Sequence, residues 1–246
     1  GWGDDTVFGG AGADTLAGNE GSDTLDGGED ADVYAFNIGD GIDHIRDTGS
    51  FGSDAIAFGP GITPEMLTLG LGSLLINVGE NGDAIHIEGF DPNNARDSSS
   101  IELFQFADGT ELTYGELIER GIDIVGTGAD DVLQGTNVND RFTGGAGNDT
   151  YFFSRGSGHD VIEDLDSAGF DTDTVLVGAN IAPADLAISR ADDFIALAIN
   201  GTSDQISIRW QPGQGYGIER VEFSDGTAWD AAALEAMAAS STNTAP

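Results

Sequence analysis

The stretch GGAGADTLA, Gly9 to Ala17, shows the unit from which much of this chain is built. Related blocks stand around it at a nine-residue period, as GWGDDTVF, GNEGSDTLD and GGEDADVYA. A second run further along reads GTGADDVLQ, GTNVNDRFT and GGAGNDTYF. Each block places glycine before an aspartate and an apolar residue two positions after it. A disordered acidic linker would not keep that apolar position, so the pattern predicts a folded repeat.

The residue types within Gly9–Ala17 predict half of one coil. Its first six residues must turn sharply and aim backbone carbonyls inward, which glycine does without steric cost. Asp14 adds an anionic oxygen to the turn. Thr15-Leu16-Ala17 then makes a short strand with its middle side chain buried. Eighteen residues would therefore complete one turn of a parallel solenoid.

Aspartates on successive coils are expected to stack along the two edges of the solenoid. Looser segments, Gly39–Ile45 and Gly156–Ile162, extend the two runs, and Asp54 and Asp173 add a further level. The predicted pairs are Asp5/Asp23, Asp14/Asp32, Asp23/Asp43, Asp32/Asp54, Asp131/Asp149, Asp140/Asp160 and Asp149/Asp173. Each gap would collect carbonyl and carboxylate oxygens, about six in all, a ligand set that calcium accepts. The spacing predicts about five to seven calcium ions.

Composition agrees with a metal-dependent fold. The chain has 44 acidic and 8 basic residues, a net charge of −36 that opposes compaction until it is neutralised. The sign excludes nucleic acid and anionic membranes as partners. The chain has no cysteine, which removes disulfides and thiolate chemistry. It shows no apolar run long enough for a membrane span and no signal peptide, and it begins inside a repeat, as a fragment would.

The segments after each run follow another pattern. Gly61–Phe90 alternates apolar residues around an Asn81–Asp83 turn, which predicts an antiparallel meander. Ile101–Gly121 then predicts a strand, a turn and a short helix from Thr113 to Arg120. The second half repeats this plan, pairing Tyr34 with Tyr151, Asp43 with Asp160 and Phe106 with Phe223 at a constant offset of 117.

The nonapeptides resemble RTX, or haemolysin-type calcium-binding, repeats. ITPEMLTL, DAIHIEGF and IELFQFADGTEL, with their second-half counterparts, resemble the haemolysin-type calcium-binding-related domain. The expected fold is all-β, with two parallel β-rolls, each followed by a small antiparallel β-rich module with a short helix. The expected segments are roll 1–58, module 59–122, roll 123–177, module 178–239 and linker 240–246.

The resemblance implies right-handed calcium-binding rolls, export by a bacterial type I secretion system, and folding at the cell surface or beyond it. In the family, ligand oxygens come from the six-residue turn and its aspartate. Carried over here, the implied turn residues are Gly1, Gly3, Gly10, Gly12, Asn19, Gly21, Gly28, Asp30, Gly39, Gly41, Thr127, Ala129, Thr136, Val138, Gly145, Gly147, Gly156 and Gly158. Asn19 replaces a usual glycine. Ala129 and Val138 do the same in the second run, which predicts weaker binding there.

Catalysis is not expected of this chain. It has no lysine and none of the HExxH, GxSxG or P-loop patterns. His44 and His159 fall at turns or strand edges, and His86 is expected to point outward. The alternative function is an adhesin-type module that binds an extracellular glycan or protein. A less favoured alternative is part of a secreted hydrolase or toxin. Trp210 and Tyr216 are the best candidates for exposed aromatic residues that would contact such a glycan or protein, although the favoured interpretation is that they pack within the meander.

Overall fold

The computed structural model describes residues 1–49, 52–165, 171–211 and 215–241. The chain forms two compact units, Gly1–Ile122 and Asp123–Pro246. The last five residues of the expected linker, 242–246, lie outside the described residues. No helix in the described ranges is both long enough and apolar enough to cross a membrane.

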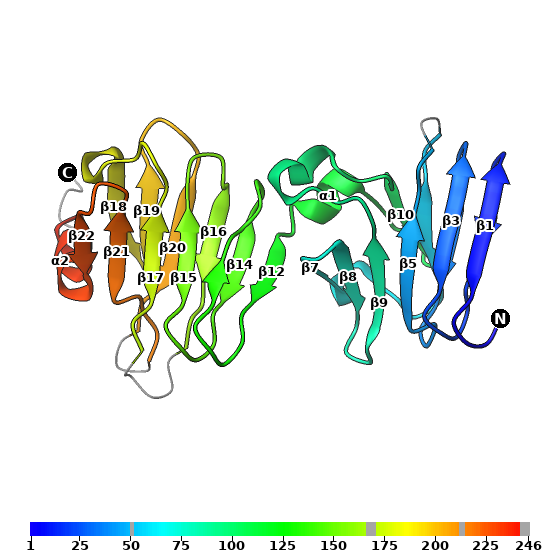
Figure 1. Cartoon of the computed structure of the whole chain (residues 1–246), viewed down its shortest axis with the longest axis horizontal. Helices are drawn as coiled ribbons and strands as arrows, with labels where there is room; N and C mark the ends of the chain where they lie inside the picture. The colour runs from blue at the N-terminus through cyan, green and yellow to red at the C-terminus, as the bar shows by residue number, and fades with distance from the viewer. Residues whose placement is uncertain (50–51, 166–170, 212–214, 242–246) are drawn as a thin grey trace. The chain divides into compact units, whose positions relative to one another are not determined.

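The first sheet of unit 1 starts as the front face of the roll and ends in the module (Figure 1). Its parallel strands are β1 (Thr6–Ala11), β3 (Thr24–Glu29), β5 (Ile42–Arg46) and β9 (Asp83–Ile87). Two antiparallel strands, β8 (Leu74–Val78) and β7 (Leu67–Gly70), complete the expected meander. One face of this sheet is buried because apolar side chains recur at every second position.

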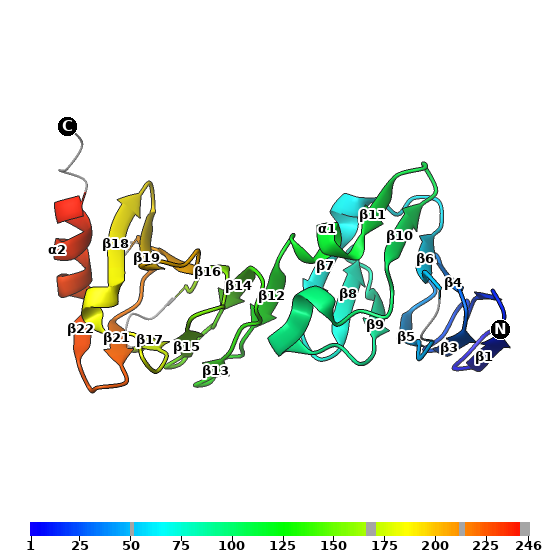
Figure 2. The ribbon, with the colours of Figure 1, turned by 90° about the horizontal axis from the view of Figure 1, so that it is seen from above.

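The second sheet of unit 1 forms the other layer (Figure 2). Its strands are β2 (Thr15–Leu16), β4 (Val33–Phe36), β6 (Ala55–Phe58), β10 (Leu103–Phe106) and β11 (Glu111–Thr113). All pair in parallel except β11, which turns back on β10. The apolar residues two after the aspartates of this sheet, Leu16, Tyr34 and Ile56, are at most 2% exposed, as is Leu25 on β3, whereas Val7 on the outer strand β1 is only half-buried. The all-β class and the parallel rolls are therefore confirmed.

The module is built onto the roll and continues both of its sheets. Strand β9 pairs with β5 at Asp43 and Ile85, and β10 pairs with β6 at Ile56 and Phe104. The sequence pattern predicted a meander that follows the roll, and it did not indicate these long-range parallel pairings. The physical reason is the open edge of the last coil, whose backbone groups would otherwise stay unpaired.

Unit 1 also contains three short helices within its described residues. They are η1 (Pro64–Met66), η2 (Pro92–Asp97) and α1 (Tyr114–Ile118). Helix α1 lies inside the predicted range and begins with a capping box, in which Thr113 and Glu116 hydrogen-bond each other's backbone amides.

Unit 2 repeats this plan. Its first sheet contains β12 (Ile122–Val125), β14 (Asp140–Thr143), β16 (His159–Ile162), β20 (Gln205–Arg209), β19 (Phe194–Ile199) and β18 (Leu186–Ala191). Its second contains β13 (Val132–Leu133), β15 (Thr150–Phe153), β17 (Thr174–Val177), β21 (Arg220–Phe223) and β22 (Ala228–Asp230). The helices are η3 (Pro183–Asp185) and α2 (Ala231–Ser241). Helix α2 therefore runs two residues into the segment predicted as linker.

The two aromatic residues considered for recognition are packed into unit 2. Trp210 is only 4% exposed, and its indole N–H donates to Glu235. The Arg209 guanidinium lies 4.4 Å from the centre of the half-buried Tyr216 ring. The packing interpretation is confirmed for Trp210, which offers no exposed aromatic platform, while Tyr216 keeps an intermediate exposure.

The joint between roll and module can be tested at Ile85, which is fully buried on β9. Ile85→Ala should lower the free energy of unfolding of the calcium-loaded chain by about 2–5 kcal/mol, because it leaves a cavity between the sheets. Ile42→Ala is the control, since Ile42 is 40% exposed on the neighbouring strand β5. Denaturant unfolding measures both variants, and equal losses would contradict a shared core.

Candidate metal sites

One hydrogen bond repeats along both edges of each roll. The backbone N–H of an aspartate donates to the Oδ1 atom of the aspartate on the next coil, at 2.7–3.1 Å. This bond joins all seven predicted pairs: Asp5/Asp23, Asp14/Asp32, Asp23/Asp43, Asp32/Asp54, Asp131/Asp149, Asp140/Asp160 and Asp149/Asp173. The structure therefore brings together the aspartates that the spacing selected.

The second carboxylate oxygen of most of these aspartates has no partner. The Oδ2 atoms that are buried without a hydrogen bond belong to Asp14, Asp23, Asp32, Asp43, Asp149 and Asp160. Burying a charged oxygen without compensation costs several kcal/mol, so each such atom needs a cation or a proton. The donor set consists of carboxylate and carbonyl oxygens, which suits calcium.

Burial raises the pKa of aspartates in both columns of each roll, including Asp32, Asp54 and Asp149. It raises the pKa of Asp43 to about 7, and the charges of Asp23 and Asp40 add to the effect. Burial, followed by repulsion from Asp140, raises the pKa of Asp160 to about 8. These carboxylates are poorly compensated by protein groups alone, because the surrounding charges have the same sign.

Glycine in the turns allows neighbouring coils to approach each other closely. The implied turn residues with positive φ are Gly3, Gly10, Gly12, Asn19, Gly21, Gly28, Asp30, Gly39, Gly41, Gly145, Gly147, Gly156 and Gly158. A Cβ on Gly28 would strike the carbonyl oxygen of Gly10, and one on Gly41 would strike that of Gly21. Asn19, at φ 67°, keeps the left-handed geometry of the glycine that it replaces.

Two turns of the second roll are closed by threonine instead. The backbone N–H and hydroxyl of Thr127 both donate to Asp131 Oδ2, at 2.6 and 2.8 Å. Thr136 binds Asp140 in the same way, with its N–H 2.6 Å from Oδ2. These two carboxylates already have partners within their own turns.

The metal role of Thr127, Ala129, Thr136 and Val138 stays a prediction, in turns that differ from the glycine turns. None of these four residues adopts positive φ, so their turns lack the open glycine conformation. In these turns a threonine hydroxyl would compete with a cation for the aspartate of its own turn.

Two family models match the chain. The model of the RTX calcium-binding nonapeptide repeat matches residues 1–34 and 125–162. The model of the haemolysin-type calcium binding protein related domain matches residues 74–116 and 196–233. Together these ranges take in more than half of the chain. The chain is an RTX repeat protein. Its repeats are calcium-binding repeats, while the number of ions and the individual ligands stay predictions.

The similarity of the chain to a solved structure is low. Among solved structures, the extracellular lipase LipA from Serratia marcescens matches this RTX chain at 17% identity with a TM-score of 0.21. The match covers 83% of this chain and 39% of the lipase chain, so the RTX chain spans well under half of that relative. A TM-score this low does not indicate a shared overall fold. No curated protein matches the chain.

The RTX modules supply carboxylates that the nine-residue period did not indicate. Asp83 Oδ2 accepts the N–H of Gly39 and its Oδ1 that of Gly41, at 2.9 and 3.1 Å, and Asp204 accepts that of Gly158 at 3.2 Å. On the other edge, Glu102 accepts the Asp54 N–H at 2.7 Å, as Glu219 does for Asp173 at 2.9 Å. Glu102 and Glu219 thus end the Asp54 and Asp173 columns, while Ile85 and Ile206 lie opposite Asp43 and Asp160, and Asp83 and Asp204 accept turn amides beside those columns. The 117-residue offset relates Glu102 to Glu219 and could have indicated their shared role.

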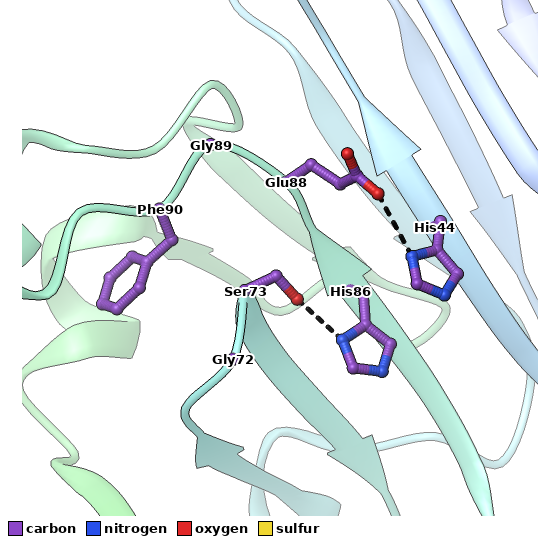
Figure 3. A pocket seen from close by; sticks show the side chains of 7 residues that line it. All are labelled: His44, Gly72, Ser73, His86, Glu88, Gly89 and Phe90. Atoms are coloured by element: carbon purple, nitrogen blue, oxygen red, sulfur yellow. Dashed lines mark hydrogen bonds and ion pairs between the residues drawn. The ribbon is translucent and has the colours of Figure 1, made fainter.

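A surface hollow of about 360 Å³ in unit 1 holds two of the histidines (Figure 3). The His44 and His86 rings stack at 4.7 Å, 10° from parallel. Ser73 Oγ lies 2.7 Å from His86 Nδ1, and Glu88 Oε1 lies 3.3 Å from His44 Nδ1. As the strand alternation predicted, His86 points away from the core that buries Ile85 and Ile87; it is half-buried in the hollow, and this burial, with the nearby His44, lowers its pKa.

The RTX fold itself does not require this histidine pair. In unit 2 the corresponding register position pairs Val161 with Ser207, where unit 1 pairs His44 with His86. His159 lies exposed on β16, and its backbone N–H donates to Asn139.

The threonine-closed turn can be tested by opening it. Thr136→Gly with Val138→Gly should release Asp140 Oδ2 and permit the glycine backbone geometry. We expect about one additional bound calcium ion, or a higher calcium affinity of the second roll. Calorimetric titration and bound-metal analysis measure both. Thr143→Gly, outside any such turn, is the matched control. Unchanged binding in the double variant would contradict a closed turn as the cause.

Proposed function

We propose that this chain is a structural module of a secreted bacterial RTX protein, and that its rolls fold when they bind calcium outside the cell. Export would use a type I secretion system, with which the unfolded chain would interact. The observation that carries the proposal is the set of six buried aspartate oxygens without partners. In a chain with a net charge of −36, those oxygens disfavour the compact rolls until a cation neutralises them.

The energetics suit a switch between two calcium concentrations. If each site has a dissociation constant of about 10–100 µM, millimolar calcium adds about 1.4–2.7 kcal/mol per site. About six such sites add on the order of 8–16 kcal/mol, comparable with the stability of a whole domain. Micromolar calcium adds almost nothing, so the chain would stay unfolded inside the cell.

The bound ions would supply positive charge between coils, and the residues of the chain would position the ligands and set the spacing of the coils. Its glycine turns hold carbonyls toward the gaps, and its aspartates fix the spacing of the coils through the amide-to-Oδ1 bonds. The modules end the stacks by pairing with the outer strands. The resulting product would be a stiff extracellular spacer.

Calcium removal tests the folding proposal. Far-UV circular dichroism in chelator should show mostly coil, and millimolar calcium should restore β signal cooperatively. Asp23→Asn should shift this transition to higher calcium, because Asp23 is fully buried and offers an unpartnered oxygen. Asp108→Asn is the control, since Asp108 is an exposed turn residue whose carboxylate accepts the Thr110 N–H within its own turn. Full folding in chelator would refute the proposal.

The proposed structural role includes no catalysis by this chain. The hollow at Ser73 and His86 is the arrangement that most resembles a nucleophile with a base. We expect the calcium-loaded chain to hydrolyse generic esterase, protease and glycosidase substrates no faster than buffer does. Turnover that disappears in Ser73→Ala or His86→Ala would overturn this expectation. Specific capture of a glycan or protein would favour the adhesin alternative.

A further inference from the structure

Two aspartates outside the nonapeptide pattern complete a cluster at the end of each roll. Asp47 follows β5, and the equivalent Asp164 follows β16. Neither lies within residues 1–34 or 125–162, which the nonapeptide model matches. The repeat spacing did not select either residue as a ligand. Their offset of 117 is that of the duplicated unit, so the chain carries the same arrangement twice.

In unit 1 the cluster consists of Asp32, Asp47 and Asp54. One carboxylate oxygen from each lies within 4.8 Å of the others. Asp54 Oδ1 accepts the N–H of Asp32 at 2.7 Å, as in the rest of the column. Asp32 is fully buried, and its Oδ2 atom has no partner. Both Asp32 Oδ2 and the Tyr34 hydroxyl lie against Gly27, so the unpartnered oxygen faces the same turn as the tyrosine.

Tyr34 holds Asp47 in this position. The Tyr34 hydroxyl is buried, accepts the Gly27 N–H at 2.9 Å and donates to Asp47 Oδ2 at 2.7 Å. A tyrosine hydroxyl is uncharged at neutral pH, so Tyr34 acts as the donor to the Asp47 carboxylate. Tyr34 therefore orients the carboxylate without adding charge, as outer groups do around metal ligands.

Unit 2 builds the same cluster with deeper burial. Asp149, Asp164 and Asp173 are all at most 2% exposed, and one oxygen from each again lies within 4.8 Å of the others. The fully buried Tyr151 donates to Asp164 Oδ2 at 2.6 Å, and the Gly145 N–H donates to Asp164 Oδ1 at 3.1 Å. Asp149 Oδ2 is buried without a partner.

We propose that each roll ends in a separate calcium site, with Asp47 in unit 1 and Asp164 in unit 2 as ligands that the nonapeptide pattern does not supply. This inference rests on the proposed function, because it assumes that the rolls bind calcium. Three carboxylates gather here, where the preceding gaps stack two. More ligand charge in a rigid, oxygen-only cavity tightens calcium binding. The two terminal sites therefore have the highest calcium affinity in the chain. The affinity of the more buried Asp164 site is higher than that of the Asp47 site.

The test compares full-length variants by calcium titration against a competing chelator. Asp47→Asn with Asp164→Asn should remove about two ions from the tightest class, while the weaker class remains. Asp23→Asn is the matched control and should reduce the weaker class. If wild type binds calcium but the double variant keeps its tightest class, the terminal sites are refuted and the proposed function stands. If wild type binds no calcium at all, the proposed function fails as well.

The tyrosines provide a second readout that does not depend on removing a ligand. Tyr34→Phe and Tyr151→Phe should keep the number of ions and weaken the tightest class by about 10- to 100-fold. They should also reduce terbium emission excited through tyrosine, since each hydroxyl contacts a ligand directly. Tyr114→Phe is the control, because the buried Tyr114 hydroxyl donates to the Ala95 carbonyl in the module. Equal terbium emission and affinity in all three variants would overturn the proposal.

Discussion

Repulsion between stacked aspartates is the constraint on which both rolls depend. Each amide-to-Oδ1 bond fixes one coil on the next, and it also places carboxylates above one another in a column. The remaining oxygen of Asp23 is buried without a partner, as is that of Asp32. The hydrogen bonds alone therefore cannot make the stack favourable, because they gather like charges in a place that water does not reach. A divalent cation in the gap turns the same arrangement into a stabilising one.

The modules solve a different problem, which is how to end the stack. A solenoid coil exposes unpaired backbone groups at its last strand. Strands β9 and β10 cover these groups in unit 1, and their module places Glu102 where the next coil would offer an aspartate, while Asp83 accepts turn amides of the last coil. The same module thus pairs the last backbone groups of the roll and supplies the last acidic side chains beside it. This explains why a roll and a module occur as one repeated unit.

The two units show that the same plan allows different local solutions. Unit 1 uses glycine, Asn19 and Asp30 in left-handed positions and keeps its turns open. Unit 2 closes two turns with Thr127 and Thr136, which occupy the aspartates themselves. Its last level, around Asp164, is nevertheless the more deeply buried of the two terminal clusters. Calcium dependence is therefore expected to be distributed unevenly along the second roll.

The sequence by itself determined the coil and its aspartate pairs, because both follow from the spacing of residues within about twenty positions of each other. It also indicated the duplication, the meanders and the helix at Thr113. Only the tertiary structure decided which acids of the module meet the last coil, since Asp54 meets Glu102 across 48 positions and Gly39 meets Asp83 across 44. The roles of Asp47 and Asp164 belong to the same class. No local period marks them, because the way in which the final coil lies on its neighbours brings them to the stacked aspartates.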